Sequence, residues 1–338
     1  MSRLSNATPR ACTPEERADD EDTRDVSADE RIERFVVTKA ESRLDRALVA
    51  RFSEYSRAEV QRWIREGAVR VDGGSATPST SLRPGSVVEV KPASAATSTA
   101  VAEAIEIDVR FEDDALLVVN KPAGMVVHPA AGHRSGTLVN AVLHHTRVED
   151  DCDPARPGVV HRLDKQTSGL LVIAKDPRAR ASLVAQFQAR TVVRRYDAIV
   201  LGTFAERATY QTFYGRDPRS RLRFTGRLKQ GKHAVTHAVR EAQLSEACLI
   251  ACKLETGRTH QIRVHLSEAG FPILGDALYG RTPLREPLGH LHRSALEAGY
   301  HYLHAATLGF MHPVSGEALA FEAERPAYFG RALDALKL

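Results

Sequence analysis

The sequence predicts an α+β protein with two folded parts of unequal size. In the shorter, N-terminal part, helical spacing of apolar residues is followed by two short alternating strand segments. In the longer part, strand-like runs dominate and two helical stretches interrupt them. These runs show no strict strand–helix–strand alternation and no Gly-x-Gly-x-x-Gly pattern, so a doubly wound dinucleotide fold is not expected.

The N-terminal residues 1–32 are polar, acidic and without periodicity, and we expect a disordered tail there. Residues 14–34 carry ten acidic residues and four arginines, a local charge of −6. The net charge of the whole chain is +4, so the remainder carries +10. A body this basic suits a polyanionic partner such as nucleic acid, although basic surfaces are also common on proteins that bind nothing anionic.

The first folded part is expected over residues 33–92. A helix that spans 57–66 is capped by Ser56 and closed by Gly67. The pattern predicts, in order, a helix over 43–52, a helix over 57–66, a strand at 69–71, a turn at 72–74 and a strand over 85–90.

Residues 93–102 are small and mostly polar, which is typical of a flexible linker. The second folded part is expected to follow over 103–338. It is predicted to contain strands over 116–120, 169–175, 195–202, 247–255 and 318–323, and helices over 137–145 and 178–189.

Composition excludes several classes of protein. Of 338 residues, 43% are hydrophobic and 27% are charged, which is ordinary for a globular protein and excludes wholesale disorder. The longest apolar runs, such as 115–119 and 170–174, fall far short of the roughly 20 residues that cross a bilayer. Residues 1–17 have no apolar core of a secretory signal, so we expect a cytoplasmic protein.

Neither a metal nor a cofactor is expected. The chain has four cysteines without a Cys-x-x-Cys pair, at Cys12, Cys152, Cys248 and Cys252. Four histidines lack carboxylates at ligand spacing and are interpreted as structural, namely His128, His145, His260 and His265.

Reactive side chains concentrate in residues 158–175. One carboxylate, Asp164, lies among basic residues and hydroxyls, and an apolar strand follows at once. A loop anchored by a rigid strand is how a protein presents a reactive group. By chemistry alone, a turn cap or a surface salt bridge remains the simpler interpretation of Asp164.

The segment 161–171 resembles the signature of the RluA-type pseudouridine synthases, His-Arg-Leu-Asp-x-x-Thr-Ser/Thr-Gly-Leu-Leu, without a mismatch. Further segments are similar to other motifs of that family and follow in family order, at 121–129, 195–198, 255–266, 275–280 and 303–306. The resemblance spans about 105–325. It implies a catalytic α+β domain over 103–338 with a mixed, largely antiparallel sheet and flanking helices.

The first part resembles an S4 RNA-binding domain in residues 42–48, 56–57 and 64–73. Arginine side chains can bind phosphates in two-point fashion, which gives salt-dependent affinity with little sequence information. Taken singly, each arginine is better explained as a solvated helix charge, but the ordered pattern favours RNA binding for the set. The predicted contacts are Arg43, Arg46, Arg57 and Arg65.

The resemblance implies isomerisation of uridine in structured RNA to pseudouridine, without a cofactor. It assigns the essential carboxylate to Asp164, which could attack C6, attack C1′ or remove a sugar proton, and the active-site tyrosine to Tyr196. An ionised carboxylate in a dry pocket needs a cationic partner. The matched residue is Arg263 and the second choice is Arg258; the alternative for Arg263 is an ordinary strand surface charge.

The target base must leave its stack before it can react. Arg162 is expected to fill the gap or clamp the RNA backbone, since guanidinium planes stack on bases. His161 is expected either to contact a phosphate or to be a satisfied loop histidine. Arg258 is expected to contact RNA.

The resemblance also bears on the RNA. Family members with an S4 domain modify large-subunit ribosomal RNA, and residues 128–141 most resemble the branch that acts on helix 69. A monomer that acts on free RNA or on a pre-ribosomal particle is expected. One alternative is a catalytically inactive RNA-binding or ribosome-assembly factor with the same fold, against which the set Asp164, Tyr196 and Arg263 counts. A carboxylate glycosidase would need a second acid.

Overall fold

The computed structural model describes residues 32–52, 57–91, 100–129, 133–149, 156–220, 222–280 and 283–337, and for residues 57–59 it describes the backbone only. The predicted tail up to residue 31, the predicted cap Ser56 and most of the predicted linker lie outside these ranges. The chain divides into two compact units, Met1–Ala95 and Ala96–Leu338. At the end of the predicted linker, the Val101 carbonyl accepts a hydrogen bond from the Asn140 side chain at 2.7 Å, so this residue already belongs to the second unit.

The described part of the first unit has the predicted order of helix, helix, strand, turn and strand, with two further short strands. Its antiparallel sheet has the strand order β1-β4-β2-β3. Gly67, at φ +76°, follows the second helix in the left-handed region that favours glycine. The elements are β1 (Glu33–Val36), α1 (Leu44–Arg51), α2 (Arg57–Arg65), β2 (Val69–Val71), β3 (Gly74–Ser75) and β4 (Val87–Val90).

The core of the first unit lies between its helices and its sheet. Leu44 and Leu48 on α1, Trp63 on α2 and Val88 on β4 are fully buried in one cluster. Burying such side chains stabilises the unit by about 1.5–3 kcal/mol each. The first unit therefore has a hydrophobic core of its own.

The second unit is built on a ten-stranded mixed sheet with the order β10-β9-β11-β12-β8-β13-β7-β6-β5, with β14 paired to β13. All neighbours are antiparallel except β7 and β13. The strands are β5 (Asp108–Glu112), β6 (Leu116–Lys121), β7 (Ser168–Ala174), β8 (Val193–Leu201), β9 (Arg207–Arg216), β10 (Phe224–Thr225), β11 (Lys232–Leu244), β12 (Ala247–Leu254), β13 (Leu303–Met311) and β14 (Ala318–Glu322).

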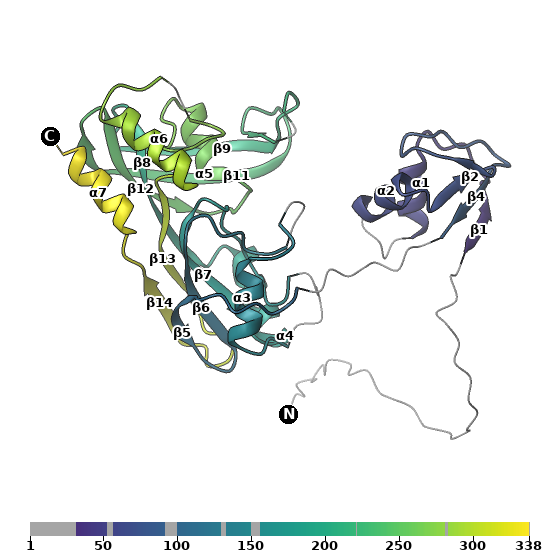
Figure 1. Ribbon diagram of the computed structural model, residues 1–338, viewed down its shortest axis with the longest axis horizontal. Helices are drawn as coiled ribbons and strands as arrows, with labels where there is room; N and C mark the ends of the chain where they lie inside the picture. Colours follow the sequence, from purple (N-terminus) through teal and green to yellow (C-terminus); the bar gives the residue numbers. More distant parts are fainter. Residues whose placement is uncertain are drawn as a thin grey trace, which may run out of the picture. The chain divides into compact units, whose positions relative to one another are not determined.

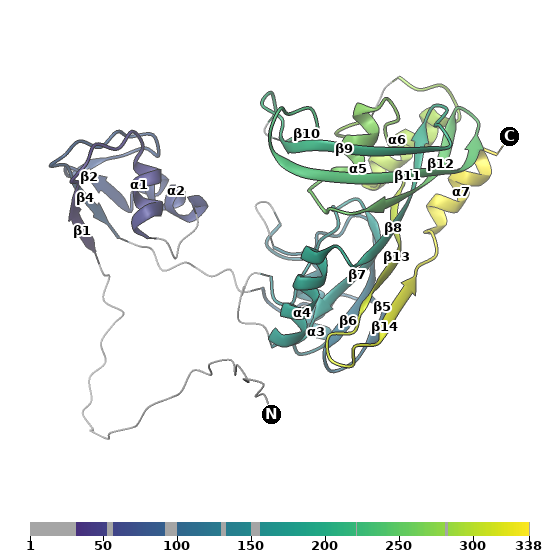
Figure 2. The same ribbon diagram turned by 180° about the vertical axis from the view of Figure 1, so that it is seen from behind.

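Helices flank both ends of this sheet. Figures 1 and 2 show α3 and α4 beside the β5–β7 end and α5 and α6 beside the β9–β12 end. No helix in the described ranges is both long and apolar enough to cross a membrane. The helices are α3 (Leu138–His145), α4 (Pro177–Ala189), α5 (Gln261–Glu268), α6 (Leu288–Ala298) and α7 (Ala327–Ala335).

The fold is α+β as predicted, and the five predicted strands and two predicted helices of the second unit are all present to within two residues at each end. One of the interpretations considered for Arg263 placed it on the surface of a strand, and the structure differs from it. It forms the helix α5, in which Arg263 is buried. The alternative interpretation of Arg263 as a strand surface charge is therefore wrong.

A close approach of two strands fixes the loop that carries Asp164. The loop ends at Gly169, where β7 runs parallel to β13 and Gly169 pairs with Ala305. Gly169 has φ +114°, and a Cβ atom there would lie 2.3 Å from the Ala305 carbonyl oxygen. Only glycine fits, and the loop is thereby held against the middle of the sheet.

Candidate active site

A pocket of about 480 Å³ gathers the three predicted catalytic residues. Asp164 comes from the loop before β7, Tyr196 from β8 and Arg263 from the first turn of α5. The volume is within the range of small-ligand sites. Residues that are far apart in the sequence thus meet at one place in the second unit.

Hydrogen bonds to the backbone make the Asp164 loop rigid. The Thr167 N–H donates to the Asp164 carbonyl at 3.1 Å, and the Gly124 N–H donates to the Lys165 carbonyl at 2.8 Å. Nζ of the buried Lys121 also donates to the Lys165 carbonyl, at 3.3 Å. The loop that carries the carboxylate therefore has little freedom to move.

The Asp164 side chain is held by a buried chain of charged groups. Arg263 donates Nη1 to Oδ2 of Asp164 at 2.8 Å. The same guanidinium donates Nε and Nη2 to the two carboxylate oxygens of Asp276, at 2.7 and 2.9 Å. Arg263 is 4% exposed and Asp276 1%. Asp276 thus fixes the plane of Arg263, and Arg263 fixes one oxygen of Asp164.

These contacts favour the ionised form of Asp164. Burial acts to raise the pKa of Asp164, but the charge of Arg263, that of His260 and the hydrogen bond from Arg263 together outweigh it, so this pKa lies below its ordinary value. Burial also acts to raise the pKa of Asp276, but the hydrogen bonds and charge of Arg263 lower this pKa to about 2. Burial also opposes the rise in the pKa of Arg263, which its contacts with Asp276 and Asp164 cause.

Asp276 bears on the glycosidase alternative, because it is a second carboxylate near Asp164. Its Oδ1 atom also accepts the backbone N–H groups of Leu278 and Tyr279, each at 2.9 Å. A buried carboxylate with these partners cannot flank a bond of a bound sugar as the second acid. The geometry therefore does not support a glycosidase.

Tyr196 forms part of both the pocket wall and the hydrophobic core. It is 7% exposed, and burial raises the pKa of its hydroxyl. It pairs with Cys252 on β12 and Ala305 on β13 in the central part of the sheet. A neutral ring held in this way can pack on a base that enters the pocket.

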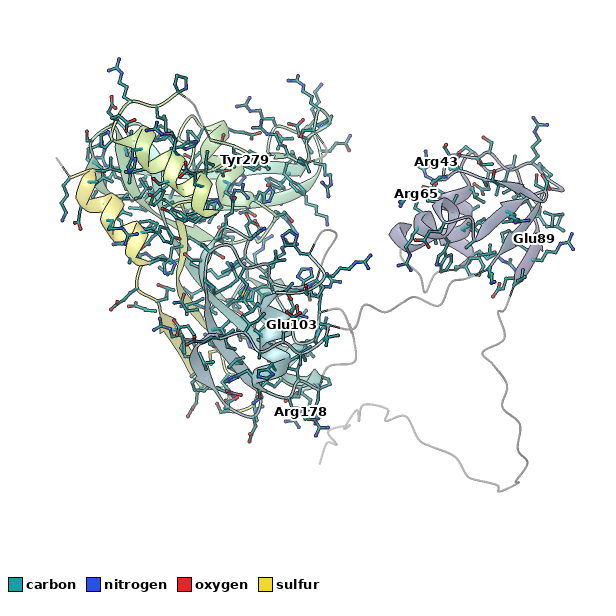
Figure 3. All side chains as sticks on the ribbon, viewed as in Figure 1. Arg43, Arg65, Glu89, Glu103, Arg178 and Tyr279 are labelled. Carbon is teal, nitrogen blue, oxygen red and sulfur yellow. The ribbon has the colours of Figure 1, made fainter. Side chains whose placement is uncertain are left out.

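His260 and Tyr279 also belong to the site, although no catalytic role was expected for them. His260 Nε2 lies 3.9 Å from Oδ2 of Asp164, and its Nδ1 lies 3.0 Å from the Tyr279 hydroxyl. The Arg263 guanidinium lies over the Tyr279 ring at 5.2 Å. Figure 3 shows Tyr279 at the end of the unit that holds α5. The motif 275–280 contained both Asp276 and Tyr279, but only the structure shows what they contact.

The predicted RNA-binding residues of the second unit separate into different environments. Arg162 lines the pocket, is exposed, and has no hydrogen bond or ion pair with another described residue. Arg258 also lines the pocket, but its Nε donates to the His233 carbonyl at 3.2 Å. Arg258 is therefore not the partner of Asp164, and Arg162 is available for RNA.

Of the two roles considered for His161, the geometry favours the structural one. Its Nε2 accepts the backbone N–H of Val172 at 3.0 Å, and its ring stacks on Phe187 at 4.6 Å. Burial lowers the pKa of His161 to about 3. A neutral ring whose lone pair is already used is a poor ligand for a phosphate, so the expectation of an RNA contact from His161 is corrected.

The arginines of the first unit also differ from one another. Arg43 donates Nε and Nη2 to the buried Asp45 at 2.9 and 3.1 Å, so one edge of its guanidinium is already hydrogen-bonded within the unit. Arg46 and Arg65 are exposed and have no ion pair with a described residue. Figure 3 shows Arg65 on the helical side of this unit. The side chain of Arg57 lies outside the described part of the chain.

A strongly basic segment, for which no role was predicted, joins β9 to β11 through β10 over 216–232 (Figure 2). Two of its arginines lie over aromatic rings, Arg216 over Phe224 and Arg223 over Tyr279, each at 5.0 Å. The signal was present in the sequence as seven basic residues against one acidic residue, namely Arg216, Arg219, Arg221, Arg223, Arg227, Lys229 and Lys232 against Asp217.

Comparisons with known proteins define the class of enzyme to which this fold belongs. Residues 115–268 match the model of the RNA pseudouridylate synthase family, and residues 42–88 match that of the S4 domain. An uncharacterized RNA pseudouridine synthase of Bacillus subtilis is 40% identical over 297 residues, which cover 87% of this chain and 94% of the relative.

Two further similarities agree with this class. The ribosomal large subunit pseudouridine synthase D of Neisseria meningitidis serogroup A is 43% identical over 303 residues, covering 88% of this chain and 80% of the relative. The solved structure of human RNA pseudouridylate synthase domain containing 4 superimposes with a TM-score of 0.52 at 26% identity, covering 68% of this chain and 92% of that chain.

The chain belongs to the RNA pseudouridylate synthase family. It is an RNA pseudouridine synthase with an S4 domain, which confirms the predicted enzyme class and fold. The chain is therefore placed in a family of enzymes, as predicted.

Proposed function

We propose that the substrate is large-subunit ribosomal RNA, with uridines of helix 69 as the first sites to examine, and that Asp164 is the carboxylate that reacts. The relatives named ribosomal large subunit pseudouridine synthase D support the choice of RNA. The observation that carries the role of Asp164 is its place in the pocket on Arg263, which is itself fixed by Asp276.

In the isomerisation the bond between N1 and C1′ of the uridine breaks and a bond between C5 and C1′ forms. A proton leaves C5 and N1 gains one, so no redox step or external group is needed. Asp164 reacts through Oδ1, which has no hydrogen bond to another described residue, while Oδ2 stays on Arg263. Tyr196, which lines the pocket, supports the base while it turns, and its hydroxyl helps with proton removal from C5.

Binding of the RNA is distributed over both units. Arg46 and Arg65 of the S4 domain and the basic segment 216–232 bind backbone phosphates, which fixes the position of the RNA with little sequence information. Arg162 fills the gap that the flipped base leaves. The protein acts as a monomer in the cytoplasm, on RNA that is free or within a pre-ribosomal particle.

The test is to map pseudouridine across total RNA from cells with and without this gene. The deletion strain is complemented with the parent, with Asp164→Asn or with Asp176→Asn. Asp176 is the matched control, because it caps α4 by accepting the Arg178 and Ala179 N–H groups, and asparagine caps helices equally well.

We expect sites in large-subunit ribosomal RNA to disappear with the gene and to return with the parent and with Asp176→Asn only. Loss of sites in other RNA classes alone would overturn the substrate proposal. Restoration by Asp164→Asn would overturn the role of Asp164 and leave the substrate proposal standing.

A further inference from the structure

Arg194 is a buried arginine to which the described residues supply no hydrogen-bonding partner. It lies on β8, lines the pocket and is 7% exposed, and its Nε atom is buried without a hydrogen bond. No other described residue forms an ion pair with it. Arginine carries five N–H donors and is rarely buried unless it is paired, so this group requires an explanation.

Strand geometry directs this side chain to the reaction site. Successive side chains of a strand point to opposite faces, so Arg194 and Tyr196 share the face that lines the pocket. Arg195, between them, is not part of the pocket wall and forms ion pairs with Asp197 and Glu241. Neighbouring arginines on one strand therefore have opposite environments.

The surroundings of Arg194 position it without neutralising it. Its guanidinium carbon lies 5.3 Å from the centre of the Phe187 ring. Its Nη1 atom lies beside Gly257, where a Cβ atom would come within 2.8 Å. The glycine leaves space for the guanidinium, and the ring supports its position.

The carboxylates of the pocket wall are already engaged elsewhere. Asp164 pairs with Arg263 at 2.8 Å. Glu255 accepts from His237 at 2.7 Å and lies 3.5 Å from Arg190. The described wall therefore offers Arg194 no carboxylate as a direct partner, which suits an anionic ligand.

We propose that Arg194 is a phosphate-binding residue that receives a phosphodiester group of the RNA next to the flipped uridine. Phosphate is the anion that every nucleotide of this substrate carries, and the fork of arginine binds it in two-point geometry. This phosphate site rests on one part of the proposed function, namely that the uridine reacts in this pocket. Occupation by phosphate neutralises the buried charge and places the sugar of the target nucleotide.

The test uses the full chain and total RNA labelled with [5-³H]uridine from cells that lack the gene. Tritium release is followed in single turnover over a range of RNA and salt concentrations for the parent, Arg194→Gln, Arg194→Lys and the control Arg195→Gln. Arg194→Gln should raise the half-saturating RNA concentration about 10-fold. It should lower the slope of log affinity against log salt by about one, with the maximal rate within about threefold of the parent.

Arg194→Lys keeps the charge without the fork, so it should retain the salt slope and lose part of the affinity. Arg195→Gln should bind as the parent does. Arg194→Gln should unfold at the same temperature as the parent or higher, because it removes an unpaired buried charge. A lower unfolding temperature with unchanged RNA affinity would show a structural role and overturn the proposal.

An unchanged salt slope, or a fall in the maximal rate alone, would also overturn the phosphate site. Should Arg194→Gln fail to fold, a parental salt slope and affinity for Arg194→Lys would contradict two-point binding. Asp164→Asn in the same assay tests the proposed function separately. If this variant still turned over, Asp164 would not be the reacting group, and the affinities measured for the Arg194 variants would be unaffected.

Discussion

Each of the two units holds an arginine in a two-point hydrogen bond with a buried aspartate. In the S4 domain Arg43 donates Nε and Nη2 to Asp45 at 2.9 and 3.1 Å. In the catalytic unit Arg263 donates the same two atoms to Asp276 at 2.7 and 2.9 Å. The local geometry is nearly the same.

The difference lies in the remaining donor. Nη1 of Arg263 reaches Oδ2 of Asp164 at 2.8 Å, inside the pocket, whereas Arg43 has no third contact with a described residue and its side chain is 36% exposed. In both cases the buried aspartate fixes the plane of the guanidinium. Only in the second unit does the guanidinium also donate a hydrogen bond to a carboxylate that lines a pocket.

The largest effect in this comparison is expected from Arg263→Met, which removes the donor and leaves two carboxylates without their partner. Turnover should fall by about 10³-fold at neutral pH, which is the upper range for loss of one charged donor from an active site. The unpaired Asp276 should also lower the stability of the fold by about 3–5 kcal/mol. Single-turnover tritium release and thermal unfolding measure the two effects.

The same variant should change the pH dependence. Arg263 holds the pKa of Asp164 below its ordinary value of 3.8, so the parent rate should not vary with the ionisation of Asp164 near neutral pH. Without Arg263, burial raises this pKa, and the protonated fraction falls as pH rises. The variant should therefore recover part of its rate at higher pH; a rate that does not vary with pH would contradict the proposed electrostatic role.

A smaller effect is expected from Asp276→Asn, which tests whether the plane of Arg263 must be fixed. Asparagine keeps one acceptor oxygen but cannot accept both hydrogen bonds, so Arg263 can shift from Asp164. A misplaced catalytic group can cost about 10²-fold in rate. The single-turnover rate should fall by that order while RNA affinity is unchanged. A parental rate would show that burial alone places Arg263.

Removal of residues 1–95 should affect affinity more than chemistry. The second unit has its own core, so the shortened protein should fold and still release tritium at saturating RNA. Without the S4 arginines, RNA binding should weaken and its salt slope should fall by about one for each phosphate that the S4 domain binds. Filter binding at several salt concentrations measures this, and an unchanged slope would exclude the S4 domain from RNA binding.

The smallest effects are expected within the S4 domain, where arginines with and without an ion-pair partner among the described residues can be compared. Arg46→Gln combined with Arg65→Gln should weaken RNA binding a few-fold without changing the unfolding temperature, because neither side chain is paired with a described residue. Arg43→Gln should instead lower the unfolding temperature, since it removes a charged partner of Asp45. A parental unfolding temperature for Arg43→Gln, with RNA binding weakened instead, would contradict the structural role given to Arg43.

These residues also show how far the sequence can be interpreted. That Asp164, Tyr196 and Arg263 belong to one site could be predicted, because each lies in a contiguous motif, and the three residues do line one pocket. Asp276 and His260 could not be given their contacts with Arg263 and Asp164, because those contacts depend on the placement of α5 and of the loop beside it. Sequence alone could not show that Arg43, and not a neighbouring arginine, is paired within the S4 domain, because this pairing depends on the buried position of Asp45.

The helix α5 was missed for a related reason. Its residues from Gln261 to Leu266 are all buried, so polar and apolar residues do not separate onto two faces. An amphipathic pattern exists only where one face of a helix meets solvent. The polar side chains of this helix are instead bound internally, as for His265 between Thr236 and Thr212 at 2.9 Å each.

The most direct test of the central claim is tritium release from RNA labelled with [5-³H]uridine, with Asp164→Asn in excess over RNA. Asparagine has nearly the volume of aspartate and keeps one acceptor oxygen, so RNA should bind about as well as to the parent while the reacting carboxylate is gone. We predict binding without detectable tritium release, and release near the parental rate for the control Asp176→Asn. Release by Asp164→Asn near the parental rate would contradict the assignment of Asp164 as the reacting group.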